Sequence, residues 1–80
     1  MQLPVIKNII EKYSIEELKA AEESLMEGEN LAIEIEGKDE GEQLTHILAA
    51  IWIKEDMAKN GTEMRLSLRN YTQRVRNSIS

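Results

Sequence analysis

The sequence contains no cysteine, which excludes a disulfide framework and a cysteine-based zinc site. It also has no run of about 20 apolar residues, the length that a helix needs to span a bilayer. The apolar stretch near the N-terminus is interrupted by Lys7 and Asn8, and no small-residue cleavage site follows it, so a secretory signal is not expected. We therefore expect a cytoplasmic protein with no membrane segment and no membrane partner.

Aromatic side chains are scarce as well. Phenylalanine is absent, and Tyr13, Trp52 and Tyr71 make up 4% of the chain, so aliphatic residues and methionine must fill the core. With 80 residues, of which 41% are hydrophobic and 31% charged, the composition is that of one folded domain covering residues 1–80. A domain this short buries only about 60% of its unfolded surface and is marginally stable alone. Oligomerisation is the expected source of further stability.

Two helices are expected in the first third of the chain. Residues 3–13 carry apolar side chains at helical spacing, and Pro4 suits the first turn of such a helix. The segment Ser14–Glu17 has the pattern of a capping box, which predicts a second helix over residues 15–27. Gly28 is the residue type that commonly ends a helix in a left-handed conformation.

Residues 31–36 change to a two-residue period. Apolar Leu31, Ile33 and Ile35 alternate with less apolar or charged neighbours, a pattern typical of a half-buried strand. A lone strand cannot satisfy its own backbone hydrogen-bonding groups, so we expect it to pair with the same strand of a second copy. The predicted fold class is therefore α+β, mostly helical, with about four helices and one short strand (residues 31–36) after the second helix.

The longest helix is expected over residues 42–60, and its middle is apolar over most of its circumference. A chain of 80 residues offers little else to cover both sides of it, which indicates a homodimer built on this helix. Trp52 lies on the flank of the main apolar stripe and is the candidate anchor of that contact. The predicted interface consists of Leu44, Ile47, Leu48, Ile51, Trp52 and Ile53.

Two interpretations compete for residues 62–68. Met64, Leu68, Tyr71 and Val75 follow one another at spacings of one helical turn, which predicts a last helix. Met64, Leu66 and Leu68 also alternate with polar residues, as a strand paired with residues 31–36 would. The helical pattern continues for longer, so we favour the helix, while the strand stays open.

The charge of the chain is divided unevenly along its length. The whole chain carries 10 basic and 15 acidic side chains, a net charge of −5. Residues 62–80 differ, because Arg65, Arg69, Arg74 and Arg76 face a single acidic residue there, Glu63, which gives +3 against −8 for residues 1–61. An arginine-rich helix could bind a nucleic-acid backbone. The acidic remainder and the lack of stacking aromatics oppose this, so a nucleic-acid partner is not expected.

One pair of residues has the chemistry of a metal site. Glu42 and His46 are four residues apart and therefore share a face of the predicted helix, and both residue types bind divalent ions. Only one histidine is present, however, and no second copy of the pair occurs. The competing interpretation is that His46 lies at a surface or interface and that Glu42 interacts with the helix dipole.

The two ends of the chain, residues 1–7 (MQLPVIK) and 73–79 (QRVRNSI), together with the third predicted helix, resemble a family of small bacterial proteins without a characterised function. The resemblance implies a short, helix-rich protein, and it implies no activity and no site residues. The function that we expect is that of a small, non-enzymatic, homodimeric interaction or accessory protein without a cofactor. The alternatives are a metal- or ligand-binding enzyme using Glu42 and His46, and nucleic-acid binding through the last helix.

Overall fold

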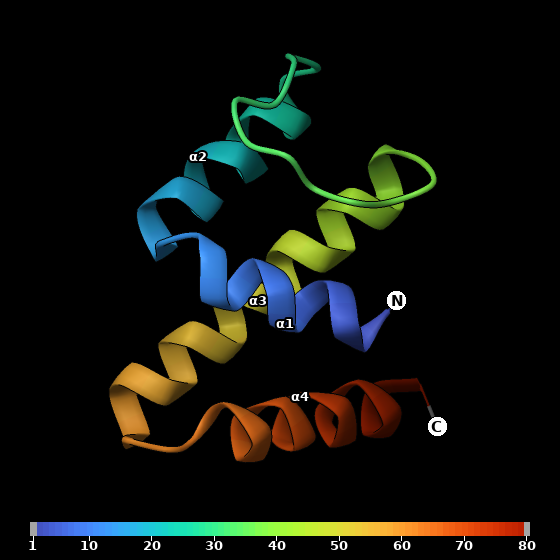
Figure 1. The fold of residues 1–80 in the computed structure, drawn as a ribbon. Helices are drawn as coiled ribbons and strands as arrows, with labels where there is room; N and C mark the ends of the chain where they lie inside the picture. Colours follow the sequence, from blue (N-terminus) through green and yellow to red (C-terminus); the bar gives the residue numbers. More distant parts are fainter. Residues whose placement is uncertain (1, 80) are drawn as a thin grey trace.

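Four helices make up the regular structure of the chain. The computed structural model describes residues 2–79, with α1 at Leu3–Lys12, α2 at Ile15–Met26, α3 at Glu40–Asn60 and α4 at Met64–Ile79. The long helix α3 lies in the middle, and each of the other three packs against it. In Figure 1, α1 crosses α3, with α2 on one side of it and α4 on the other. None of the helices is long and apolar enough to cross a membrane, for the residues described.

The domain is all-helical, so the predicted α+β class is wrong. Residues 31–36 form an extended segment, and no strand occurs anywhere in residues 2–79. The predicted alternation of burial is nevertheless present, because Ile35 is buried and Leu31 and Ile33 are half-buried, whereas Glu34 and Glu36 are exposed. The two-residue alternation of apolar and polar side chains therefore reflects an extended segment that packs on the core, and not a strand of a β-sheet.

Side chains of the same chain take the place of a neighbouring strand. The hydroxyl of Tyr13 accepts a hydrogen bond from the backbone N–H of Glu34 and donates one to its carbonyl, both at 3.3 Å. Gln43 Nε2 donates to the carbonyl of Ile35 at 3.1 Å, and His46 Nδ1 lies 2.8 Å from the carbonyl oxygen of Glu36. Because these backbone groups already have partners, the predicted pairing of this segment across a dimer is wrong as well.

The capping signals explain where the helices begin and end. Ser14 and Glu17 form the predicted capping box, in which each side chain bonds the backbone N–H of the other. The side chain of Asp39 accepts from the N–H of Glu42 at 2.8 Å, and α3 therefore begins at Glu40, two residues earlier than predicted. Gly28 and Gly61 follow α2 and α3 with positive φ angles of 75° and 65°. The sequence pattern indicated this conformation for Gly28.

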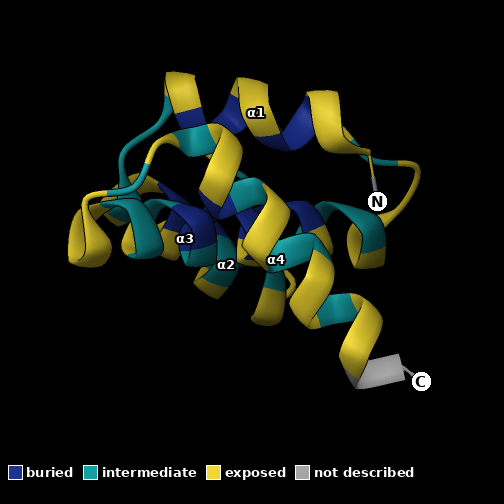
Figure 2. Cartoon of the chain, turned by 90° about the horizontal axis from the view of Figure 1, so that it is seen from below, coloured by how far each residue is buried: buried dark blue, intermediate teal, exposed yellow. Residues whose placement is uncertain are grey.

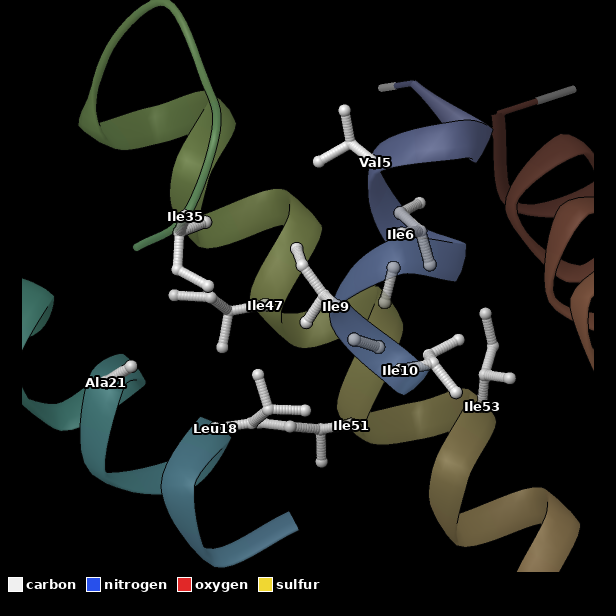
Figure 3. Close-up of a cluster of buried hydrophobic side chains, with 12 residues drawn as sticks. Val5, Ile6, Ile9, Ile10, Leu18, Ala21, Ile35, Ile47, Ile51 and Ile53 are labelled. Carbon is white, nitrogen blue, oxygen red and sulfur yellow. The ribbon is translucent and has the colours of Figure 1, made fainter. Parts of the chain in front are cut away.

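The core lies between α3 and the two N-terminal helices. In Figure 3, Leu18 of α2 points toward Ile51, and Ile10 of α1 lies near Ile53. Ile35 from the extended segment covers Ile47 in the same view. Figure 2 shows the buried residues gathered on α3 and on the side of α1 that faces it, whereas α4 is half-buried or exposed along most of its length. The core is aliphatic, as the scarcity of aromatic residues required.

Residues 64–79 are helical, so the strand alternative for residues 62–68 is wrong. The helix turns Leu68 toward the core and leaves Leu66 outside with 48% of its surface exposed. A strand would have placed both leucines on one face. Met64, Tyr71 and Val75 are half-buried, which agrees with the predicted inward face of this helix.

Candidate functional surfaces

His46 is completely buried, and both of its ring nitrogens are hydrogen-bonded to backbone groups. Its Nε2 accepts from the N–H of Gln2, just before α1, at 3.1 Å. Its Nδ1 faces the carbonyl of Glu36 at 2.8 Å, and a carbonyl can only accept. The hydrogen bonds therefore assign the neutral ring with its proton on Nδ1. The imidazole joins three parts of the chain: the start of α1, the extended segment and α3.

Glu42 and His46 hydrogen-bond to different parts of the chain. Glu42 Oε1 accepts from the N–H of Lys38 at 3.3 Å, so it bonds the loop that leads into α3. The Nε2 lone pair of His46, which a metal ion would need, is used by Gln2. No group of three histidine, aspartate or glutamate side chains that could hold a metal ion occurs in the described part of the chain. The geometry gives both residues a structural role, which they share with Tyr13 and Gln43.

The predicted interface residues divide into two groups. Ile47, Ile51 and Ile53 are buried in the core of the single chain. Leu48 has 44% of its surface exposed, and Leu44 and Trp52 are half-buried. The three isoleucines are covered by α1, α2 and the extended segment. Leu44, Leu48 and Trp52 therefore lie on the side of α3 that these elements leave open. The dimer itself remains a prediction.

The open side of α3 runs between α2 and α4. Leu48, Trp52 and Glu55 follow at helical spacing and share one face. Glu55 pairs with Lys19 of α2 at 3.7 Å, which marks the α2 edge. Trp52 contacts Tyr71 of α4, with ring centroids 5.5 Å apart, which marks the α4 edge. Partial burial raises the pKa of the Tyr71 hydroxyl above its ordinary value of 10.0. We call Leu44, Leu48 and Trp52 the open face of α3.

The α2 edge of this face is acidic. A hollow of about 600 Å³ there is lined by Lys19, Glu22, Glu23, Met26 and Glu27, and Met26 has 72% of its surface exposed. A hydrogen bond with Glu29 and the charge of Glu23 raise the pKa of Glu27 above its ordinary value of 4.5. The carboxylates of Glu22, Glu23 and Glu27 make this edge of the face negatively charged.

The four arginines of α4 do not form a single basic surface. Arg74 lies over Trp52, with its guanidinium carbon 5.9 Å from the ring centroid, on the α4 edge of the open face. Arg65, Arg69 and Arg76 lie on another side of the helix, where they line a groove that also includes Leu3 of α1. The four arginines are close together in sequence, but at 3.6 residues per turn Arg74 falls on a different face of the helix from the other three.

A cluster of hydrogen bonds holds the corner between α3 and α4. Asn60 Nδ2 donates to Asp56 Oδ1 at 2.6 Å, and the Thr62 hydroxyl donates to Asp56 Oδ2 at 3.5 Å. The buried Ser67 hydroxyl bonds that of Thr62. The hydrogen bond from Ser67 lowers the pKa of Asp56 below its ordinary value of 3.8, burial opposes this, and Asn60, Thr62 and Asn70 lower it further. The cluster thus joins the end of α3, the connecting residues and the first turn of α4.

The comparisons with known proteins place the chain in a family. The model of DUF6952, a family of unknown function, matches residues 1–80. The chain belongs to the DUF6952 family. Searches of curated proteins and of solved structures found no match. Membership in DUF6952 confirms the inferred relation to an uncharacterised family and extends it from the two ends and the third predicted helix to the whole chain. Membership in this family supplies no activity.

Proposed function

We propose that this chain is a small, non-enzymatic interaction protein that works as a homodimer through the open face of α3. The observation that carries the proposal is the position of Leu48. It lies in the middle of the central helix with 44% of its surface exposed, between half-buried Leu44 and Trp52. Apolar residues gathered on one face, rather than scattered singly, favour a protein contact.

Charge also favours a second copy as the occupant. The α2 edge carries the carboxylates of Glu22, Glu23 and Glu27, and the α4 edge carries Arg74. A two-fold axis parallel to α3 places the acidic edge of one protomer opposite the basic edge of its partner. Opposite charges then meet at both rims of the contact while the leucines meet at its centre. Exposed Met26 extends the apolar surface toward the partner.

The test is the molar mass in solution, measured by light scattering on a sizing column over a range of concentrations. We expect the mass of two chains for the wild type and of one chain for Leu48→Glu, because a carboxylate in an apolar contact is left without a partner. Leu66→Glu is the matched control. Leu66 has 48% of its surface exposed, close to the value for Leu48, but lies on the outer side of α4. Leu66→Glu should leave the dimer intact.

Trp52 offers a second measurement, because it is the only tryptophan and lies in the open face. Its emission should shift to shorter wavelength as the protein concentration rises and the contact forms. Leu48→Glu should abolish the shift. A wild type that stays monomeric at every concentration would overturn the proposal, as would a Leu48→Glu variant that still forms the dimer.

A further inference from the structure

A groove lined by arginines lies between the start of α1 and the middle of α4. It has a volume of about 440 Å³ and is lined by Leu3, Arg65, Leu68, Arg69, Thr72, Gln73 and Arg76. Three of these residues are arginines and none is acidic, in a chain whose net charge is −5. The groove therefore gathers positive charge on a chain whose net charge is negative.

Two of the arginines are available to a ligand. Arg65 and Arg69 are exposed, and neither forms an ion pair with a carboxylate of the described residues. They are four residues apart in α4, which is about 6 Å along the helix axis. Guanidinium groups one turn apart can each bind a phosphate of the same polyphosphate, since their planar donors match phosphate oxygens in pairs. Arg76 extends the positive charge along the groove.

The floor of the groove is apolar. Leu68 packs against the core from α4, and Leu3 of α1 has 38% of its surface exposed. Gln73 adds an amide at the rim. A floor of two leucines beside two arginines suits a molecule with an apolar or aromatic body next to its anionic groups. The volume of the groove lies in the range of about 300–1,000 Å³ that is usual for small-molecule sites.

We infer that this groove binds a small molecule of the nucleoside polyphosphate class, with phosphates on Arg65 and Arg69 and the base against Leu3 and Leu68. A nucleic-acid strand fits less well. Residues 1–61 carry a net charge of −8, which repels an extended polyanion, and no aromatic side chain lines the groove to stack successive bases. The groove is distinct from the proposed dimer contact, because Arg74 and Trp52 mark the opposite side of α4.

The test is isothermal titration calorimetry of the 80-residue chain with ATP and, separately, with inorganic tripolyphosphate. We expect ATP to bind more tightly than tripolyphosphate, because only ATP has a body for the apolar floor. Arg65→Gln/Arg69→Gln should weaken both ligands at least about tenfold, which is the loss of one charge-assisted hydrogen bond. Both arginines are exposed, so the fold should survive, and an unchanged circular dichroism spectrum checks this.

Two further variants separate the site from general electrostatics. Arg74→Gln removes one arginine charge from the same helix but outside the groove, and it should leave both affinities unchanged within about twofold. Leu3→Ser should weaken ATP alone and leave tripolyphosphate unaffected.

The proposal is overturned if ATP does not bind, or if the double arginine variant binds it as well as the wild type. It is also overturned if Arg74→Gln is as damaging as the double variant, or if tripolyphosphate binds as tightly as ATP. Tighter binding of single-stranded DNA than of ATP, lost in the same double variant, would replace the proposal with a nucleic-acid surface.

Discussion

Gly37 passes so close to Gln43 that a β-carbon on Gly37 would lie 2.7 Å from Gln43 Cγ and 2.8 Å from the Gln43 backbone nitrogen. Two residues earlier, the carbonyl of Ile35 accepts a hydrogen bond from the Gln43 side chain at 3.1 Å. Hydrogen bonds from Gln43 and His46 hold the extended segment against the first two turns of α3, and the lack of a side chain at position 37 allows this close approach. A backbone atom cannot rotate away, so this close approach depends on glycine.

Gly37→Ala should therefore destabilise the domain. Overpacking against a fixed backbone costs about 1–3 kcal/mol, which we expect as the loss in free energy of unfolding by urea. Glu36→Ala is the matched control. Glu36 is exposed and bonds His46 only through its backbone carbonyl, so its side chain should change stability by less than about 0.5 kcal/mol. Equal stabilities of the Gly37→Ala and Glu36→Ala variants would contradict the prediction and show that the segment moves to accommodate the β-carbon.

The sequence predicted the helices well because their signals are local. The capping box at Ser14–Glu17 and the glycines at 28 and 61 act within one turn of the helix that they end or begin. The strand was mispredicted because its outcome depends on distant residues. Residues 31–36 alternate as a strand does, but the groups that bond their backbone are side chains of Tyr13, Gln43 and His46. Periodicity carries no information about such partners.

The candidate surfaces were predictable only in part. The sequence correctly indicates that α3 is apolar around most of its circumference. The shortness of the chain suggested that both sides of α3 could not be covered, but Ile47 and Ile53 are buried within the single chain. The sequence suggests His46 as a metal ligand or as a surface or interface residue, whereas in the structure it is buried and hydrogen-bonded to backbone groups. The groove joins Leu3 to α4, and no local pattern relates residues so far apart in sequence.

The His46 hydrogen bonds predict a large loss of stability on truncation. His46→Ala removes a fully buried ring and leaves the Glu36 carbonyl and the Gln2 N–H without their partner. We expect the free energy of unfolding to fall by about 2–4 kcal/mol, since a cavity and lost hydrogen bonds act together. Thr45→Ala, next to it on the exposed side of α3, should cost far less.

The same bonds predict the response to metal ions. With both ring nitrogens engaged, Zn²⁺ or Mn²⁺ has no free lone pair at His46, so millimolar additions should leave the melting temperature unchanged. A rise in melting temperature with Zn²⁺ that disappears in a Glu42→Gln variant would contradict the structural role and restore the metal-site hypothesis.

Lys54 connects two helices by capping one of them. Its Nζ donates to the carbonyl of Ile10 at 3.0 Å, and Ile10 lies in the last turn of α1, where carbonyls have no partner within the helix. A cation also interacts favourably with the negative end of the helix dipole. Lys54→Met keeps most of the aliphatic length and should cost about 1 kcal/mol in urea unfolding, with a smaller loss at high salt. Lys7→Met, exposed in the middle of α1 and away from any helix end, should be neutral, and equal losses for the two variants would argue against the cap.

The cluster around Asp56 predicts how stability depends on pH. The hydrogen bond from Ser67, with further ones from Asn60, Thr62 and Asn70, lowers the pKa of Asp56 in the folded chain below the ordinary 3.8. The folded state therefore binds this proton less readily than the unfolded state. The resulting stabilisation is fully present above pH 3.8 and is lost as the pH falls through the lowered pKa. The raised pKa of Glu27 acts in the opposite sense, because its charged form is disfavoured in the folded chain.

Comparison with Asp56→Asn separates the two effects, since Glu27 is the same in both proteins. The wild type should be the more stable at neutral pH, and the difference in free energy of unfolding should shrink as the pH is lowered below 3.8. Chemical unfolding at a series of pH values, followed by circular dichroism, measures that difference directly. A difference that stays constant from neutral pH into this acidic range would show that the carboxylate gains nothing from its charge at this corner.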